Sequence, residues 1–205
     1  MKLAKQLLAA AIGLSAAASA QAQTVTWSTS GAFSGCGMAD AGATWVSCTV
    51  GTTTLRYDFN TGSTVSLIPA LPVSSGNFGS FVMSGGGLAV QSFAGVSFDM
   101  YINQIVPTPG NQAVTGSVSG NVITQGGQLF WGPIAPPSFM IDNITYSLDV
   151  DAATQSIRIN PPGLRGEDGE VQTVRGTIVP EPASFTLVFA GLAGLGFVAR
   201  RRQRA

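Results

Sequence analysis

The interior of this chain alternates apolar and polar residues along most of its length, and no interior segment has a convincing helical period. The clearest case is 96–106, where Val96, Phe98, Met100 and Ile102 are separated by polar side chains. Side chains of a β-strand point to opposite faces in turn, so a period of two predicts a strand with one buried face. The sequence therefore predicts an all-β fold: one domain, mostly antiparallel, arranged as a β-sandwich or jelly roll.

About ten strands are expected between residues 24 and 178, with turns rich in glycine, proline and asparagine between them. The alternating segments 54–60 and 64–68 flank Asn60-Thr61-Gly62, so they are expected to pair as a hairpin. The glycine-rich stretch 31–42 is interpreted as a loop. Residues 74–87 hold short apolar pieces among glycines and serines, and they predict a loop with a weak strand.

The C-terminal region has three parts in order: Pro180-Glu181-Pro182, an uncharged apolar run over 183–199, and a tail with Arg200, Arg201, Arg202 and Arg204. The prolines predict an extended, accessible segment over 179–182. A helix over the apolar run would span roughly 26 Å, near the lower limit for a transmembrane helix. The arginines place its end in the cytoplasm and the rest of the chain outside. An ordinary tail anchor or stop-transfer helix is the alternative.

This order of parts resembles the PEP-CTERM sorting signal, found on exported proteins of Gram-negative bacteria that make extracellular polysaccharide. The resemblance covers 179–205. It implies a partner, the membrane-embedded cysteine protease exosortase, which processes the signal near Pro-Glu-Pro. Pro180, Glu181 and Pro182 would then be the recognition element and 183–199 a transient anchor in the inner membrane. The four arginines would be the cytoplasmic stop.

The N-terminal region predicts a secretory signal peptide over 1–22. Lys2 and Lys5 precede an apolar stretch that is too short to span a membrane comfortably. Ala18-Ser19-Ala20 and Ala20-Gln21-Ala22 both fit the small-x-small cleavage rule, so cleavage after Ala20 and after Ala22 both stay open. An N-terminal membrane anchor is the alternative. The predicted ectodomain is 23–178.

The chain has two cysteines, Cys36 and Cys48, and predicted export places them outside the cytoplasm. Disulfides persist outside the cytoplasm, so the two are expected to be bonded. The alternatives are a reactive thiol and a metal site. Two cysteines in a chain without histidine make a poor metal site, and no metal or cofactor is predicted.

The predicted ectodomain is acidic although the whole chain is neutral. Between residues 23 and 178 only four basic residues face nine acidic ones, a net charge of about minus five. Nucleic-acid binding requires a basic surface. We therefore expect no nucleic-acid partner.

Few residues could carry out catalysis. Without histidine, and without lysine in the mature body, Ser–His–Asp triads and Schiff-base chemistry are excluded. Paired carboxylates remain for glycoside hydrolysis, but Asp58, Asp99, Asp149 and Asp151 are expected on the solvated faces of strands. Asp149-x-Asp151 could also ligate calcium, a solvated acidic loop being the alternative. The sequence predicts a protein that is not an enzyme.

Two aromatic residues are candidates for glycan contacts, because exposed rings stack on sugar faces. Tyr101 lies on the polar side of its predicted strand, and Trp131 lies beside a proline-rich bend. The alternative for Trp131 is a core position. The expected function is that of an exported cell-surface or extracellular-matrix protein with a structural ectodomain. The alternative is a polysaccharide-binding module of the biofilm matrix.

Overall fold

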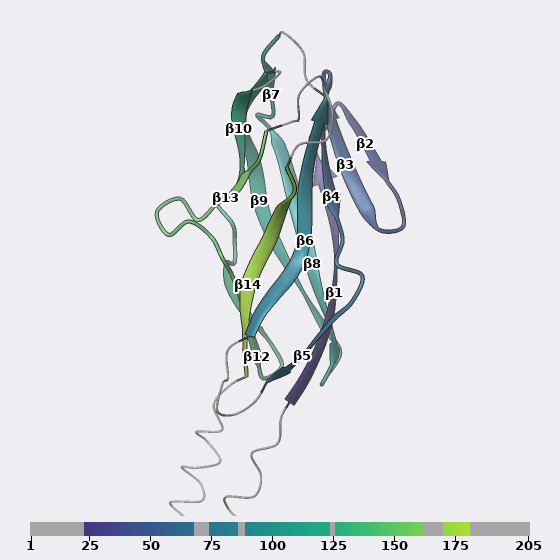
Figure 1. Cartoon of the computed structure of the whole chain (residues 1–205), viewed down its shortest axis with the longest axis vertical. Helices are drawn as coiled ribbons and strands as arrows, with labels where there is room; N and C mark the ends of the chain where they lie inside the picture. The colour runs from purple at the N-terminus through teal and green to yellow at the C-terminus, as the bar shows by residue number, and fades with distance from the viewer. Residues whose placement is uncertain (1–22, 68–73, 86–88, 124–125, 162–169, 181–205) are drawn as a thin grey trace, which may run out of the picture.

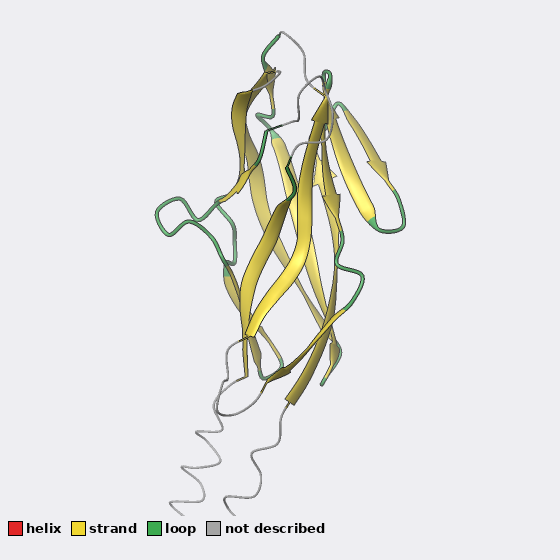
Figure 2. Ribbon diagram, viewed as in Figure 1, coloured by secondary structure: helices red, strands yellow, loops and turns green. Residues whose placement is uncertain are grey.

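The protein folds into strands alone over the residues that its computed structural model describes, namely 23–67, 74–85, 89–123, 126–161 and 170–180 (Figures 1 and 2). The predicted signal peptide and transmembrane helix lie outside these residues. Within them no helix is long and apolar enough to cross a membrane. The strands are β1 Gln23–Ser34, β2 Met38–Ala41, β3 Trp45–Val50, β4 Thr53–Asp58, β5 Ser63–Leu67, β6 Ser74–Gly85, β7 Gln91–Ser92, β8 Val96–Val106, β9 Gly110–Ile123, β10 Gly126–Trp131, β11 Ser138–Ile141, β12 Ile144–Leu148, β13 Ile157–Ile159 and β14 Gln172–Pro180.

The strands form two antiparallel sheets. Sheet A has the order β13-β10-β9-β8-β1-β5, with β7 paired to β9, and sheet B has the order β11-β12-β14-β6-β4-β3-β2. The ring of Tyr57 in sheet B lies 4.8 Å from that of Phe98 in sheet A, centroid to centroid, so the sheets pack face to face as a sandwich. Successive strands stay together in the meanders β2–β3–β4 and β8–β9–β10. The predicted all-β fold of two antiparallel sheets is therefore confirmed, and the jelly-roll alternative stays a prediction.

Strand β8 has the bounds and the alternation that the sequence predicts. Val96, Phe98, Met100 and Ile102 are buried, and the residues between them face outward. Its neighbour β9 buries three valines at intervals of four, Val114, Val118 and Val122. Together with the inward residues of sheet B they form one continuous hydrophobic core.

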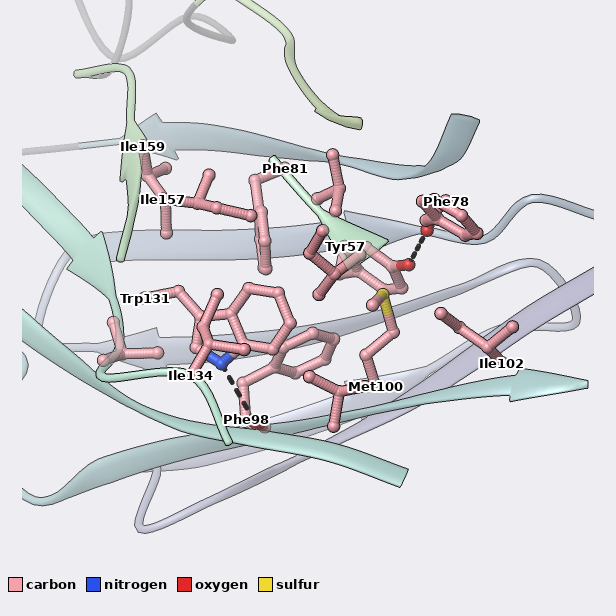
Figure 3. Close-up of a cluster of buried hydrophobic side chains, with 14 of the residues drawn as sticks. Tyr57, Phe78, Phe81, Phe98, Met100, Ile102, Trp131, Ile134, Ile157 and Ile159 are labelled. Carbon is pink, nitrogen blue, oxygen red and sulfur yellow. Dashed lines mark hydrogen bonds between the residues drawn. The ribbon is translucent and has the colours of Figure 1, made fainter. Parts of the chain in front are cut away.

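Trp131 belongs to this core, and its prediction as a glycan contact is wrong. Its side chain is 0% exposed, and its indole nitrogen donates a hydrogen bond of 3.1 Å to the carbonyl oxygen of Phe98 (Figure 3). Gly116 on the adjacent strand provides the space, because a Cβ there would lie 2.6 Å from the indole nitrogen. Trp131 follows buried Leu129 by two positions, and the strand period therefore turns it inward.

Two buried tyrosine hydroxyls donate hydrogen bonds inside the sandwich. The Tyr57 hydroxyl donates to the carbonyl oxygen of Phe78 (Figure 3), and the Tyr146 hydroxyl donates to Gln104 Oε1 at 2.7 Å. Burial raises the pKa of both phenols far above the usual value; for Tyr57 the Thr29 hydroxyl partly offsets this. Both hydroxyls therefore stay protonated and serve as structural donors.

Strand β6 is longer and more central than the sequence predicts. It runs over twelve residues between β14 and β4, where a loop with a weak strand was expected. Its pairing with β14 shifts register opposite Thr173–Arg175, and Gly79 has a φ of +106° there. This bulge lets Phe78 and Phe81 both face the core although they are three residues apart. Because the bulge interrupts the alternation of apolar and polar residues, the sequence pattern does not predict a strand of this length.

Two other expectations are wrong near the N-terminus. Residues 31–42 are not one loop, because β1 continues to Ser34 and β2 follows at Met38. The segments 54–60 and 64–68 do not form a hairpin. Strand β5 instead crosses to sheet A and pairs with β1, with Val65 opposite Val25. Asn60 marks the crossing, since its backbone nitrogen donates to Thr29 Oγ1 at 2.9 Å and its carbonyl oxygen accepts from Thr29 N at 2.8 Å.

We expect Trp131→Ala to lower the free energy of unfolding by about 3–5 kcal/mol, because it leaves a large cavity and removes the hydrogen bond to the Phe98 carbonyl. Tyr101→Ala removes a half-exposed ring from the outer surface, and its effect should stay within about 0.5 kcal/mol. Urea unfolding followed by tryptophan fluorescence and by circular dichroism measures both. Equal effects of the two substitutions would contradict the core position of Trp131.

Candidate functional site

Strand β14 carries the C-terminal motif and lies inside sheet B. It pairs with β6 from Gln172 to Ile178 and with β12 from Gly176 to Pro180. Val174 and Ile178 point into the core and are fully buried. The last strand of the sandwich is therefore a central strand, and the β11–β12 hairpin joins the rest of sheet B through it.

The described part of the strand reaches into the predicted recognition element. Val179 lies opposite Thr145 and Pro180 lies opposite Ile144 in the ladder with β12. Both residues are half-buried. Val179 and Pro180 are extended, as the sequence predicts, but they are paired with β12 and half-buried instead of freely accessible. The described sandwich thus reaches Pro180, two residues beyond the predicted ectodomain boundary at 178. A proline has no backbone N–H to donate to a neighbouring strand, so it is tolerated only where the ladder does not require that donor.

The alternation of apolar residues already predicts that the strand continues past 178, which the expected boundary did not take into account. The alternation of Val174, Gly176 and Ile178 on the buried side continues without a break to Pro180. The remaining predicted sorting residues, Glu181, Pro182, Arg200, Arg201, Arg202 and Arg204, lie outside the described residues, as does the apolar run 183–199.

Both ends of the sandwich emerge at the same end of the molecule. Figure 1 shows the start of β1 next to the end of β14, close to the label of β12. The Gln23 side-chain nitrogen donates to Asn143 Oδ1 at 3.3 Å, which joins the first residue of β1 to the β11–β12 turn. That turn precedes Ile144, the partner of Pro180. We call this end, formed by Gln23, Asn143, Ile144 and Pro180, the base of the sandwich.

Tyr101 lies on the outer face of sheet A, as the sequence predicts. Its side chain is 38% exposed, and its register partners on β1 and β9 are Ser30 and Ala113. Two positions along β8, Asn103 lies opposite Ser28 and Asn111. We call this set of outward residues the Tyr101 face: Ser28, Ser30, Tyr101, Asn103, Asn111 and Ala113. It carries hydroxyls, amides and one aromatic ring, and none of its residues is charged.

Cys36 and Cys48 form the predicted disulfide. Their Cα atoms are 5.4 Å apart, and Cys48 is buried in the core. The bond closes a loop around β2 and ties the β1–β2 connection to β3. On a chain-entropy estimate a loop of this size stabilises the fold by about 2–3 kcal/mol. The disulfide holds the exposed edge strand β2 in place.

Two of the four candidate carboxylates, Asp58 and Asp151, have local partners. The Asp58 carboxylate forms an ion pair with the Arg56 side chain on the same strand, with 2.9 Å between Arg56 Nε and Asp58 Oδ1. The Asp151 carboxylate accepts hydrogen bonds from the Thr154 backbone N–H and hydroxyl and from the Ala153 backbone N–H. These hydrogen bonds lower the pKa of Asp151. Asp99 lies on β8 opposite Thr115. Among the described residues no group of three or more histidine, cysteine, aspartate or glutamate residues is placed to hold a metal ion.

Comparison with known protein families identifies the C-terminal segment. The model of the PEP-CTERM protein-sorting motif matches residues 179–202. The match begins inside β14, covers Pro-Glu-Pro and the apolar run, and includes three of the four arginines but not Arg204. No curated protein and no solved structure matches the chain. The chain therefore carries a PEP-CTERM sorting motif, which indicates a substrate of exosortase.

Proposed function

We propose that this protein is exported, held briefly in the inner membrane with its C-terminus in the cytoplasm, processed by exosortase, and delivered to the cell surface or extracellular matrix. The ectodomain then acts as a structural component and not as an enzyme. The sorting motif at 179–202 is the observation that carries this proposal. The motif begins inside β14, so the sorted part is a folded sandwich whose described strands all precede Glu181.

The chemistry of the ectodomain supports a structural role. The candidate carboxylates Asp58 and Asp151 are engaged by local partners, and the buried tyrosine hydroxyls donate hydrogen bonds within the core. Its sheets expose many serine and threonine side chains, which pair across strands, for example Ser34 with Ser97 at 2.6 Å and Ser138 with Ser147 at 2.7 Å. A surface of this kind is hydrated, carries little charge and suits a matrix environment.

Polysaccharide binding is the second candidate, and the Tyr101 face favours it. The ring of Tyr101 is accessible on a sheet surface and is surrounded by hydroxyl and amide groups. Aromatic rings bury the apolar faces of sugars, while amides and hydroxyls both donate to and accept from sugar hydroxyls. The six residues of the face carry no charge, and the Asp99 carboxylate lies two positions along β8 on the same side, so its ligand would be a neutral glycan and not an anionic one.

The processing step is tested by the intact mass of the protein from cells with and without exosortase. We expect the tail Arg200–Ala205 to be lost only where exosortase is present. Glu181→Ala should abolish this loss because it removes the charged group of the recognition element. Glu170→Ala removes an exposed carboxylate just before β14 and should be processed normally. A mature form that keeps the arginine tail in normal cells would refute the proposal.

Glycan binding is tested on an array of neutral polysaccharides with the mature protein. If the Tyr101 face binds sugar, Tyr101→Ala should weaken binding by about tenfold, equivalent to ~1.4 kcal/mol. Tyr101→Phe keeps the ring and should retain most of the affinity. Thr115→Ala changes an exposed residue of the same sheet outside this face and is the matched control. Absence of binding across the array would leave the structural role as the only proposal.

A further inference from the structure

A row of outward side chains crosses sheet A near its β13 edge. Phe130 of β10 lies directly opposite Ser119 of β9 on one side and opposite Arg158 of β13 on the other. Their neighbours along the strands, such as Trp131 and Ile157, are buried in the core, so the row points away from it. Because directly opposite residues have Cβ atoms about 4.5–5.5 Å apart, a hydroxyl, an aromatic ring and a guanidinium stand side by side.

This row borders a pocket at which several segments of the chain meet, and we call it the Phe130 pocket. Its volume is about 300 Å³. Its lining residues come from β9, from β10 with the bend that follows it, and from the loop before β13: Ser119, Phe130, Gly132, Pro133, Thr154 and Ser156. Small-molecule pockets measure about 300–1,000 Å³, so this one suits a single small ring.

The walls of the pocket are held by backbone contacts between its segments. The Gly132 nitrogen donates to the carbonyl oxygen of Ser117 at 2.8 Å, and the Ile134 nitrogen donates to that of Gln155 at 2.8 Å. A Cβ at Gly132 would lie 2.6 Å from the Cβ of Ser156, so the bend after β10 lies directly against the loop before β13. The pocket is therefore part of the folded framework and does not have to form when a ligand binds.

The hydroxyl of Thr154 has a defined orientation at this pocket. It donates to Asp151 Oδ1 at 2.8 Å, and it lies 2.7 Å from the Ser156 hydroxyl. Because the Thr154 proton is given to Asp151, Ser156 is the donor in the second bond. A hydroxyl oxygen has two acceptor lone pairs, so Thr154 keeps one for a ligand hydroxyl.

Arg158 gives the site a positive charge. Its side chain is exposed, and within the described residues its guanidinium has no ion-pair or hydrogen-bond partner. A guanidinium binds a carboxylate through two parallel hydrogen bonds. The ectodomain as a whole is acidic, but at physiological salt charges farther away than about 8 Å are largely screened. The negative charge of Asp151 disfavours an anion at the loop, so the carboxylate of a ligand belongs on the Arg158 side of Phe130.

We propose that the Phe130 pocket binds one hexuronate unit of an acidic polysaccharide. In this arrangement the apolar face of the pyranose ring packs on Phe130, as sugar rings do on exposed aromatic side chains. The sugar hydroxyls exchange hydrogen bonds with Ser119 and Thr154, and the sugar carboxylate pairs with Arg158. The site is separate from the Tyr101 face, and it depends neither on that face nor on processing by exosortase.

The proposal is tested by calorimetric titration of the mature protein with two tetrasaccharides, one of galacturonate and a matched one of galactose. We expect the galacturonate tetramer to bind about tenfold more tightly or better, because only its carboxylates can form charged hydrogen bonds with Arg158. Equal affinity for the two tetramers, or no binding of either, would overturn the proposal. Export and processing of the protein would stand unaffected by that result.

A pair of arginine variants separates this pocket from the net charge of the protein. Arg158→Gln should weaken galacturonate binding about tenfold and leave galactose binding unchanged, since it removes only the charged donor. Arg175→Gln removes an exposed arginine from the outer face of β14, outside the pocket, and changes the net charge equally. It should bind galacturonate as the parent protein does. If the two variants bind galacturonate equally, Arg158 does not hold the ligand and the assignment is wrong.

Discussion

The architecture depends on the two-sided pairing of its last strand. β14 joins the β11–β12 hairpin to β6 and so completes sheet B, and its buried face is Val174, Gly176 and Ile178. A sheet whose central strand comes last cannot close until that strand is in place. In this chain the same strand runs directly into the sorting motif. Completion of the fold and presentation of the motif therefore involve the same few residues.

Much of the fold could be predicted because alternation and burial coincide. In β8, β9 and β12 one face is apolar and the other is polar, and the structure buries the predicted face in each. The failures have local physical causes. A bulge at Gly79 breaks the alternation of β6, and the hydrogen bonds between Asn60 and Thr29 take β5 to the opposite sheet. Tertiary pairing of this kind leaves no short-range pattern in the sequence.

The candidate sites divide in the same way. The disulfide and the sorting motif rest on chemistry that is local in sequence, and both were predicted. The two aromatic candidates required knowledge of which face of a strand is covered. Tyr101 and Trp131 each stand in an alternating segment, yet one is on the outer surface and the other is at the centre of the core. Gly116, which makes room for Trp131, could not be linked to it from sequence because the register between β9 and β10 was unknown.

The central claim is that β14 belongs to the folded sandwich up to the sorting motif, and amide hydrogen exchange on the full-length protein in detergent tests it most directly. The account predicts that the amides from Gly176 to Ile178 exchange as slowly as those of β8, because both segments are paired on two sides. Exchange of these amides as fast as in the exposed turn around Ala153 would contradict it. In that case β14 would not be a central strand of the folded sandwich, and the sheet would end before the motif.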